Sequence, residues 1–147
     1  MKSQMESDLL IDASNLIVGR MASYVAKRAL EGTRVVIVNA ERAVISGSKA
    51  NVVSEVKLRL RTRTLGSLKE GPTHPRRPDT YVRRIIRGML PWDRPKGKIA
   101  YKRVRVYIGL PDAFKEKITV RVPKAEASGL RGSYVTVGDL SREIGGT

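Results

Sequence analysis

The sequence predicts an α/β fold with parallel strands, and three consecutive segments near its beginning carry that prediction. Residues 9–13 form a short apolar run, and residues 19–30 follow with apolar side chains at helical spacing. Residues 34–39 are rich in β-branched side chains and are bounded by turn-forming residues, which is typical of a strand buried on both faces. Strand, helix and strand in about 30 residues make a βαβ unit, in which the strands are parallel and the crossover is right-handed.

The first predicted helix is amphipathic. At about 100° per residue its apolar side chains share one face, formed by Met21, Ala22, Val25, Ala26 and Ala29. Gly32 follows this pattern, and glycine readily takes the left-handed conformation that ends many helices. We therefore expect the helix to end there and the chain to enter the second strand directly.

A second helix is expected after Gly47. Ser48 is a suitable N-cap residue, and apolar side chains then recur at helical spacing at Val52, Val53, Val56 and Leu60. The preceding residues 43–46 fit either a short strand or an extended turn. Residues 57–63 alternate with a period of two, yet we favour a helix because cations near a helix C-terminus complement its dipole.

A third helix is expected over residues 80–90, after an irregular loop at 65–78 that glycines and prolines punctuate. Asp79 is predicted to cap this helix and Pro91 to end it. One face is apolar and consists of Tyr81, Val82, Ile85, Ile86 and Met89. The opposite face carries Arg83, Arg84 and Arg87. The pattern predicts a helix with an apolar back and an arginine front.

The remaining chain alternates loops and short elements. Residues 92–103 continue basic, with Gly97 expected in a loop, and residues 104–108 predict a strand. Residues 1–111 are expected to form the main domain and residues 112–147 a C-terminal extension packed on it or trailing from it. Within the extension, residues 118–122 are strand-like, 125–132 loop-like, and 137–144 suit a short helix.

Composition narrows the classes of function. The 147 residues include no cysteine and one histidine, so we expect neither a disulfide framework nor a metal site, and no cofactor. No apolar run approaches the ~18 residues of a membrane span, and the polar beginning has no apolar signal-peptide core. No lipidation motif accompanies the basic residues, so membrane binding is not expected. The prediction is a cytoplasmic protein.

Positive charge is concentrated between residues 57 and 105. That region holds 16 lysines and arginines against Glu70, Asp79 and Asp93, whereas the rest of the chain is nearly balanced within a net charge of +15. A solvated face is the usual explanation of surface charge. Here the cations are largely arginines, the flanks are also basic, and few acids are near, all of which favours a polyanionic partner.

Aromatic residues make up only 5% of the chain, which disfavours a base-stacking platform and favours recognition of phosphate, sugar and shape in a large structured RNA. The solitary histidine fits base stacking and simple solvation equally well. The predicted RNA-binding residues are Lys57, Arg59, Arg61, Arg63, Lys69, His74, Arg76, Arg77, Arg83, Arg84, Arg87, Arg94, Lys96, Lys98, Lys102 and Arg103.

Two other functions stay open at this level. The segment Ser46–Lys49 precedes a helix start and would suit a phosphate in a nucleotide-dependent enzyme, although it lacks the glycine spacing of a P-loop and a capped helix start explains it as well. Asn39 and Glu41 follow a strand where open α/β sheets place ligands, but turn and capping roles are commoner. A free-standing RNA-binding regulator of translation would share the same electrostatics.

Several blocks of the sequence closely resemble the universal family of large-subunit ribosomal protein thirteen. They are Ile11-Asp-Ala13, Val18-Gly-Arg-Met-Ala-Ser23, Ile37-Val-Asn-Ala-Glu41, Ile86-Arg-Gly-Met-Leu-Pro91 with Gly97-Lys98, and Val104-Arg-Val-Tyr-Ile-Gly109. The short connection from Gly32 to Arg34 resembles archaeal and eukaryotic members. The stretch after Pro111 matches no shared block.

The resemblance implies a three-layer α/β/α fold around a small, mainly parallel sheet, with no catalytic activity and no small-molecule substrate. It implies a structural protein of the large ribosomal subunit that binds large-subunit ribosomal RNA, adjoins other ribosomal proteins and acts early in subunit assembly. The family's signature region falls on Arg83, Arg87, Gly88, Met89, Leu90, Pro91, Gly97 and Lys98. Of these, we expect Arg83, Arg87 and Lys98 to face RNA, and Met89 and Leu90 to pack against the core.

Overall fold

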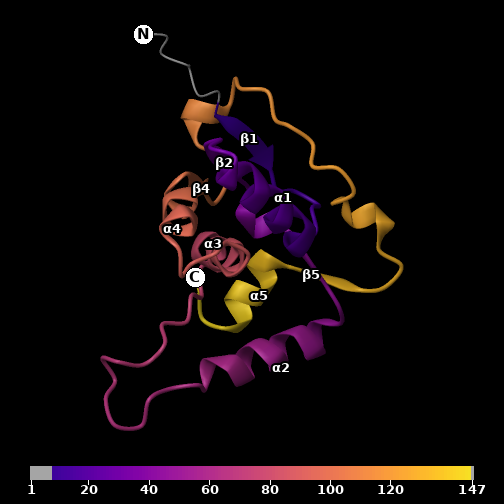
Figure 1. Ribbon diagram of the computed structural model, residues 1–147. Helices are drawn as coiled ribbons and strands as arrows, with labels where there is room; N and C mark the ends of the chain where they lie inside the picture. Colours follow the sequence, from indigo (N-terminus) through magenta and orange to yellow (C-terminus); the bar gives the residue numbers. More distant parts are fainter. Residues whose placement is uncertain (1–7, 147) are drawn as a thin grey trace.

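A small parallel sheet lies in the upper half of Figure 1 in the computed structural model, which describes residues 8–146. Its strands are β1 (Leu9–Asp12), β2 (Val35–Val38) and β4 (Val104–Val106), in the order β1-β2-β4. Both neighbouring pairs are parallel, with Leu9 opposite Val35 and Val35 opposite Val104. The predicted α/β class is confirmed, although β4 ends two residues before the predicted strand does.

Helix α1 (Val18–Leu30) connects β1 to β2. All five residues of its predicted apolar face are buried. The helix ends just before Gly32, whose φ of +103° confirms the expected glycine termination. The amphipathic pattern is sufficient to place this helix because its apolar face packs entirely against the core.

The two faces of the sheet are covered differently. Ile11, Ile37 and Val104 belong to a core that also contains the buried residues of α1. On the other face, Leu10, Val36 and Val38 are covered by two half-buried aromatic side chains, Tyr107 and Phe114. Phe114 lies in the short 3-10 helix η2 (Asp112–Phe114). Strand β2 is therefore buried on both faces, as its continuous apolar run predicts.

A second, two-stranded sheet joins distant parts of the chain. Strand β3 (Val44–Ser46), which follows the 3-10 helix η1 (Ala40–Arg42), pairs antiparallel with β5 (Tyr134–Thr136). The sequence left residues 43–46 open between strand and turn, because the partner that makes them a strand comes from far along the chain. The predicted terminal helix is confirmed as α5 (Val137–Glu143).

Helix α2 (Lys49–Leu60) lies apart from the central sheet, at the bottom of Figure 1. Its apolar residues Val52, Val53, Val56 and Leu60 pack on a cluster formed by Val135, Leu140 and Ile144. Ser48 caps the helix by accepting a hydrogen bond from the Asn51 backbone N–H at 3.4 Å, which confirms its predicted role. The helix ends at Leu60, so the prediction that it continues to Arg63 is wrong.

Helix α3 (Pro78–Gly88) begins earlier than predicted. Its N-cap is Arg77, and Pro78 occupies the first helical turn, where its fixed φ suits a helix start. Asp79 therefore lies inside the first turn, and its predicted capping role is wrong. Met89, predicted to pack against the core, is 42% exposed, whereas Leu90 is buried as expected.

Helix α4 (Pro95–Lys102) occupies a region where the sequence predicted a loop. Gly97 lies inside this helix, and a Cβ atom added there would sit 2.1 Å from the carbonyl oxygen of Pro91. Glycine is thus required by close backbone packing and not by a turn. A glycine near a proline usually marks a loop, which explains the wrong prediction.

The segment after η2 contributes to the main core. Val122, Ala125 and Val137 are buried with the residues of α1 and the central sheet. Residues 118–122 were predicted to be strand-like but form no strand. One backbone hydrogen bond, from the Val120 N–H to the Leu10 carbonyl at 2.7 Å, joins them to β1. The 3-10 helix η3 (Ala127–Gly129) follows.

Within residues 8–146, no helix combines the length and the apolar character that crossing a membrane would require.

Candidate nucleic-acid interface

The sixteen predicted RNA-binding residues lie on α2, on segment 61–77, on α3, on the α3–α4 connection, on α4 and, for Arg103, directly after α4. In Figure 1 segment 61–77, α3 and α4 are all drawn on the left-hand side of the molecule. Most of the sixteen are exposed, namely Lys57, Arg59, Arg61, Arg63, Lys69, Arg76, Arg77, Arg84, Arg94, Lys96, Lys98 and Lys102. The remaining four, His74, Arg83, Arg87 and Arg103, are half-buried.

Few carboxylates neutralise this set. Arg59 pairs with Glu55 at 2.6 Å and Arg77 with Asp79 at 3.5 Å. In the described part of the chain, no carboxylate oxygen lies within 4.0 Å of the other members. Unpaired cations on one region of the surface create a positive potential that attracts polyanions.

Residues 65–77 are irregular, as predicted, and the irregular segment already begins at Arg61, after the end of α2. Both ends of segment 61–77 are tethered. His74 Nε2 lies 2.8 Å from the carbonyl oxygen of Thr62, so the ring closes the loop on itself. At the other end, the buried Ser141 Oγ lies 2.6 Å from the Arg76 carbonyl oxygen and 2.5 Å from that of Gly146. Gly146 packs so closely that an added Cβ would meet the Arg76 carbonyl at 2.0 Å. Ser141 and Gly146 thus fix the position of the C-terminal end of segment 61–77.

Replacing Ser141 by Ala is expected to lower the free energy of unfolding by about 1–2 kcal/mol, because the buried hydroxyl that donates to one or the other of the Arg76 and Gly146 carbonyls is lost. Trypsin should also cut segment 61–77 faster, which gel electrophoresis measures. Ser54→Ala is the control, since this hydroxyl lies on the exposed surface of α2. Equal cleavage rates in Ser141→Ala and the unmodified protein would contradict the tether.

The arginines of α3 are not equivalent. Arg84 is exposed, but the Arg83 Cζ lies 4.4 Å from the centre of the Tyr101 ring and the Arg87 Cζ lies 4.1 Å from the centre of the Trp92 ring. The two rings meet edge to face at 5.2 Å. The predicted arginine front is therefore partly covered by aromatic side chains of the α3–α4 region.

Arg103 serves the fold directly. Its Nη1 donates to the Ala29 carbonyl at 3.1 Å and so satisfies a backbone oxygen near the end of α1. The positive charge near that helix end also complements the helix dipole.

Tyr81, beside the interface, and Asp12, which lies apart from it, have shifted pKa values. Burial raises the pKa of Tyr81, which lies on α3 and packs against the cluster of Val135, Leu140 and Ile144, and the positive charge of Arg59 partly opposes this. For Asp12, burial opposes ionisation, but hydrogen bonds from the Ser14 N–H and the Asn39 side chain outweigh it, so the pKa of Asp12 is lowered. Asp12 is therefore ionised at neutral pH.

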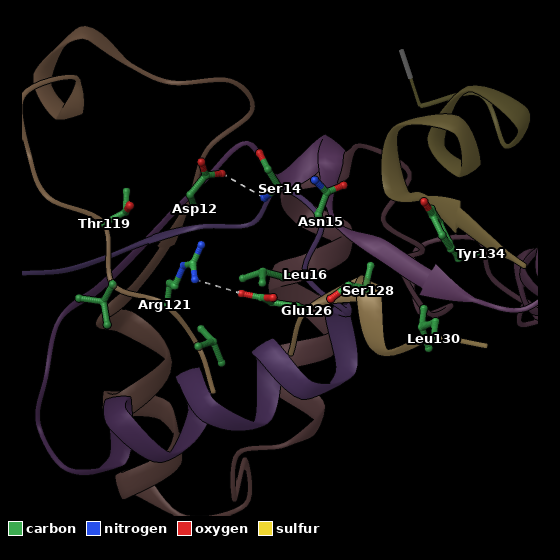
Figure 2. A pocket seen from close by; sticks show the side chains of 13 residues that line it. Asp12, Ser14, Asn15, Leu16, Thr119, Arg121, Glu126, Ser128, Leu130 and Tyr134 are labelled. Atoms are coloured by element: carbon green, nitrogen blue, oxygen red, sulfur yellow. Dashed lines mark hydrogen bonds and ion pairs between the residues drawn. The ribbon is translucent and has the colours of Figure 1, made fainter. Parts of the chain in front are cut away.

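Asp12 lines a cleft of about 730 Å³ at the carboxyl end of β1, shown in Figure 2. Its opposite wall comes from residues 119–122 and includes Arg121, whose Nη1 lies 3.7 Å from Glu126 Oε1. None of the sixteen predicted residues lines this cleft. It is separate from the candidate interface.

Segment Ser46–Lys49, considered above as a phosphate site of an enzyme, makes contacts within the protein instead. Ser48 caps α2, and Lys49 Nζ pairs with Glu143 Oε1 at 3.0 Å. Asn39 donates to Asp12 at 3.0 Å, and Glu41 accepts from the Gly109 N–H at 3.0 Å. Each of these residues therefore has a structural role at a turn or helix start. Among residues 8–146, no three His, Asp or Glu side chains gather as a metal site would require.

Sequence reasoning missed the aromatic partners of the arginines. Trp92 follows α3, and Tyr101 lies on the helix that the sequence did not predict. The available signal was the presence of both rings within the basic region, where a stacked arginine is a common arrangement. The tether at Ser141 carried no sequence signal, because it joins residues 65 positions apart.

Comparison with known proteins gives a consistent result. A family model described as Ribosomal protein L13 matches residues 6–113. A large ribosomal subunit protein uL13 from Methanococcoides burtonii is 48% identical, over 92% of this chain and 96% of its own length. Proteins of the same name from Methanopyrus kandleri and Saccharolobus solfataricus are 47% and 43% identical, over 92% and 95% of this chain and 86% and 94% of their own lengths. Matches of this extent include most of the segment after Pro111.

Proposed function

The chain belongs to the ribosomal protein L13 family, and from this premise we propose that it is a structural constituent of the large ribosomal subunit that binds large-subunit ribosomal RNA. The family is structural and not enzymatic, so the nucleotide-dependent enzyme is set aside. The proposal extends to a contribution early in subunit assembly and to a place in the cytoplasm beside other large-subunit proteins.

One observation carries the RNA-binding part of this proposal. The exposed basic residues of α2, segment 61–77, α3 and α4 are almost free of carboxylate partners within residues 8–146. A folded protein that concentrates unpaired cations in this way repels itself, and a polyanion removes that repulsion. Phosphates contacted by lysine and arginine release counterions, which supplies much of the affinity of such proteins for nucleic acid.

Sucrose-gradient fractionation of a cell extract tests the assignment to the subunit. The protein is expected to sediment with large subunits and to stay with them through a high-salt wash, because many contacts within an assembled particle hold it in place. Recovery in the light fractions would instead support a free-standing regulator of translation. In parallel, the affinity of the purified protein for large-subunit ribosomal RNA should fall steeply with salt, and a flat response would contradict electrostatic binding.

A further inference from the structure

We propose that Tyr101 and Trp92 are positioning residues, which hold Arg83 and Arg87 as a prearranged pair for two phosphate groups of an RNA backbone. This inference rests on the proposed function and deepens it. It assigns a specific phosphate site to the α3–α4 region and separates that site from the exposed cations of segment 61–77.

The geometry supplies the first argument. The guanidinium carbon of each arginine lies over an aromatic ring, 4.4 Å from the ring centre for Arg83 on Tyr101 and 4.1 Å for Arg87 on Trp92. Stacking of this kind leaves the edge of the guanidinium group, with its N–H donors, available for phosphate oxygens. Since the two rings also contact each other edge to face at 5.2 Å, the four side chains form one connected unit.

The charges supply the second argument. Arg83 and Arg87 lie one helical turn apart on α3, so their positive charges repel each other. Within the described residues neither arginine has a carboxylate within 4.0 Å, and the buried Arg83 Nε has no hydrogen-bond partner. Asp79 lies one turn before Arg83 on α3, but it forms its ion pair with Arg77. Neither stacked arginine therefore has an ion-pair partner among the described residues, and phosphate groups at the outer edges of the two guanidinium groups would supply one.

The packing of α4 explains how the rings are held. Gly97 places the start of α4 directly against the Pro91 carbonyl, and Tyr101 lies one turn further along the same helix. The close approach at Gly97 thus fixes the position of Tyr101 relative to α3. A mobile arginine loses side-chain freedom when it binds a phosphate, and an arginine already stacked on a ring has lost part of that freedom beforehand.

The test removes the rings and keeps every charge. Trp92→Leu and Tyr101→Leu are each expected to weaken binding of large-subunit ribosomal RNA about tenfold, and to reduce the slope of log K against log salt by about 0.7–0.9 for each displaced arginine. Trp92→Tyr and Tyr101→Phe keep an aromatic face and should bind nearly as well as the unmodified protein. Tyr107→Leu is the matched control, because Tyr107 pairs with Phe114 on the other side of the sheet.

Thermal unfolding of every variant accompanies the binding measurements. Folded leucine variants that bind with unchanged affinity and salt slope would overturn the proposal, as would an equal loss in Tyr107→Leu. If a leucine variant does not fold, Arg83→Lys and Arg87→Lys replace it, since lysine keeps the charge but lacks the planar fork. Unchanged binding by both lysine variants would also overturn the proposal. If the proposed function itself is wrong, the unmodified protein will not bind large-subunit ribosomal RNA, or will bind it with an affinity that does not change with salt.

Discussion

Replacing Gly97 by Ala is expected to lower the free energy of unfolding by at least about 3 kcal/mol, at the upper end of the cost of overpacking. The added Cβ would sit 2.1 Å from the Pro91 carbonyl oxygen and 2.5 Å from its carbon. Both atoms belong to the backbone, so no side-chain rotation relieves the clash. The start of α4 must move away from residue 91, and chemical denaturation followed by circular dichroism measures the result.

Gly88→Ala is the matched control for this substitution. Gly88 is the last residue of α3, and an added Cβ there meets no atom within 4 Å. Alanine favours helix more than glycine does, so this variant should be as stable as the unmodified protein or slightly more stable. If the two variants were equally stable, the close approach of α4 to Pro91 would be wrong.

The loss of α4 packing should also appear in RNA binding. Because Gly97 fixes the helix that carries Tyr101, a shift of α4 would separate Tyr101 from Arg83. Gly97→Ala is therefore expected to weaken binding under conditions where the protein is still folded. Gly88→Ala should leave binding unchanged.

Sequence periodicity predicted the elements whose own apolar pattern is continuous, whatever they pack against. The helix at 18–30 and the strand at 35–38 were both found because each buries a continuous pattern of its own residues. The strand at 44–46 stayed ambiguous because its partner, β5, lies at 134–136. Helix α4 was missed for a related reason, since the contact that requires Gly97 is with a residue outside that helix.

In the candidate site, too, the sequence predicts properties of single residues but not the contacts between them. Charge counting marks the whole basic region, because charge is a property of each residue taken alone. It does not separate Arg84, which is exposed, from Arg83, which stacks on Tyr101, or from Arg103, which donates to Ala29. The distinction depends on three-dimensional neighbours. Dividing a helix into an apolar face and a polar face does not show which aromatic side chains of the following element will cover its arginines. Whether the members of the set bind RNA stays a prediction for experiment.

Neutralising four exposed cations at the start of the basic region is expected to weaken binding of large-subunit ribosomal RNA about 1,000-fold at 0.1 M salt. The variant combines Lys57→Gln, Arg61→Gln, Arg63→Gln and Lys69→Gln. All four side chains are exposed and none has a carboxylate within 4.0 Å in the described part of the chain. The estimate follows from losing four phosphate contacts, each worth about 0.7–0.9 in the slope of log K against log salt. Filter binding over a salt series measures both quantities.

The control removes the same charge from another surface. Lys115→Gln, Lys117→Gln, Arg121→Gln and Arg131→Gln are also exposed positions, and they lie in the segment after the basic region. Both variants lower the net charge from +15 by the same amount, so a general attraction between a cationic protein and RNA weakens equally in the two. Contact-based binding weakens only in the first variant, because salt screens charges separated by more than about 10 Å. Equal losses in affinity and slope would show that net charge, and not the surface formed by residues 57–105, determines the affinity.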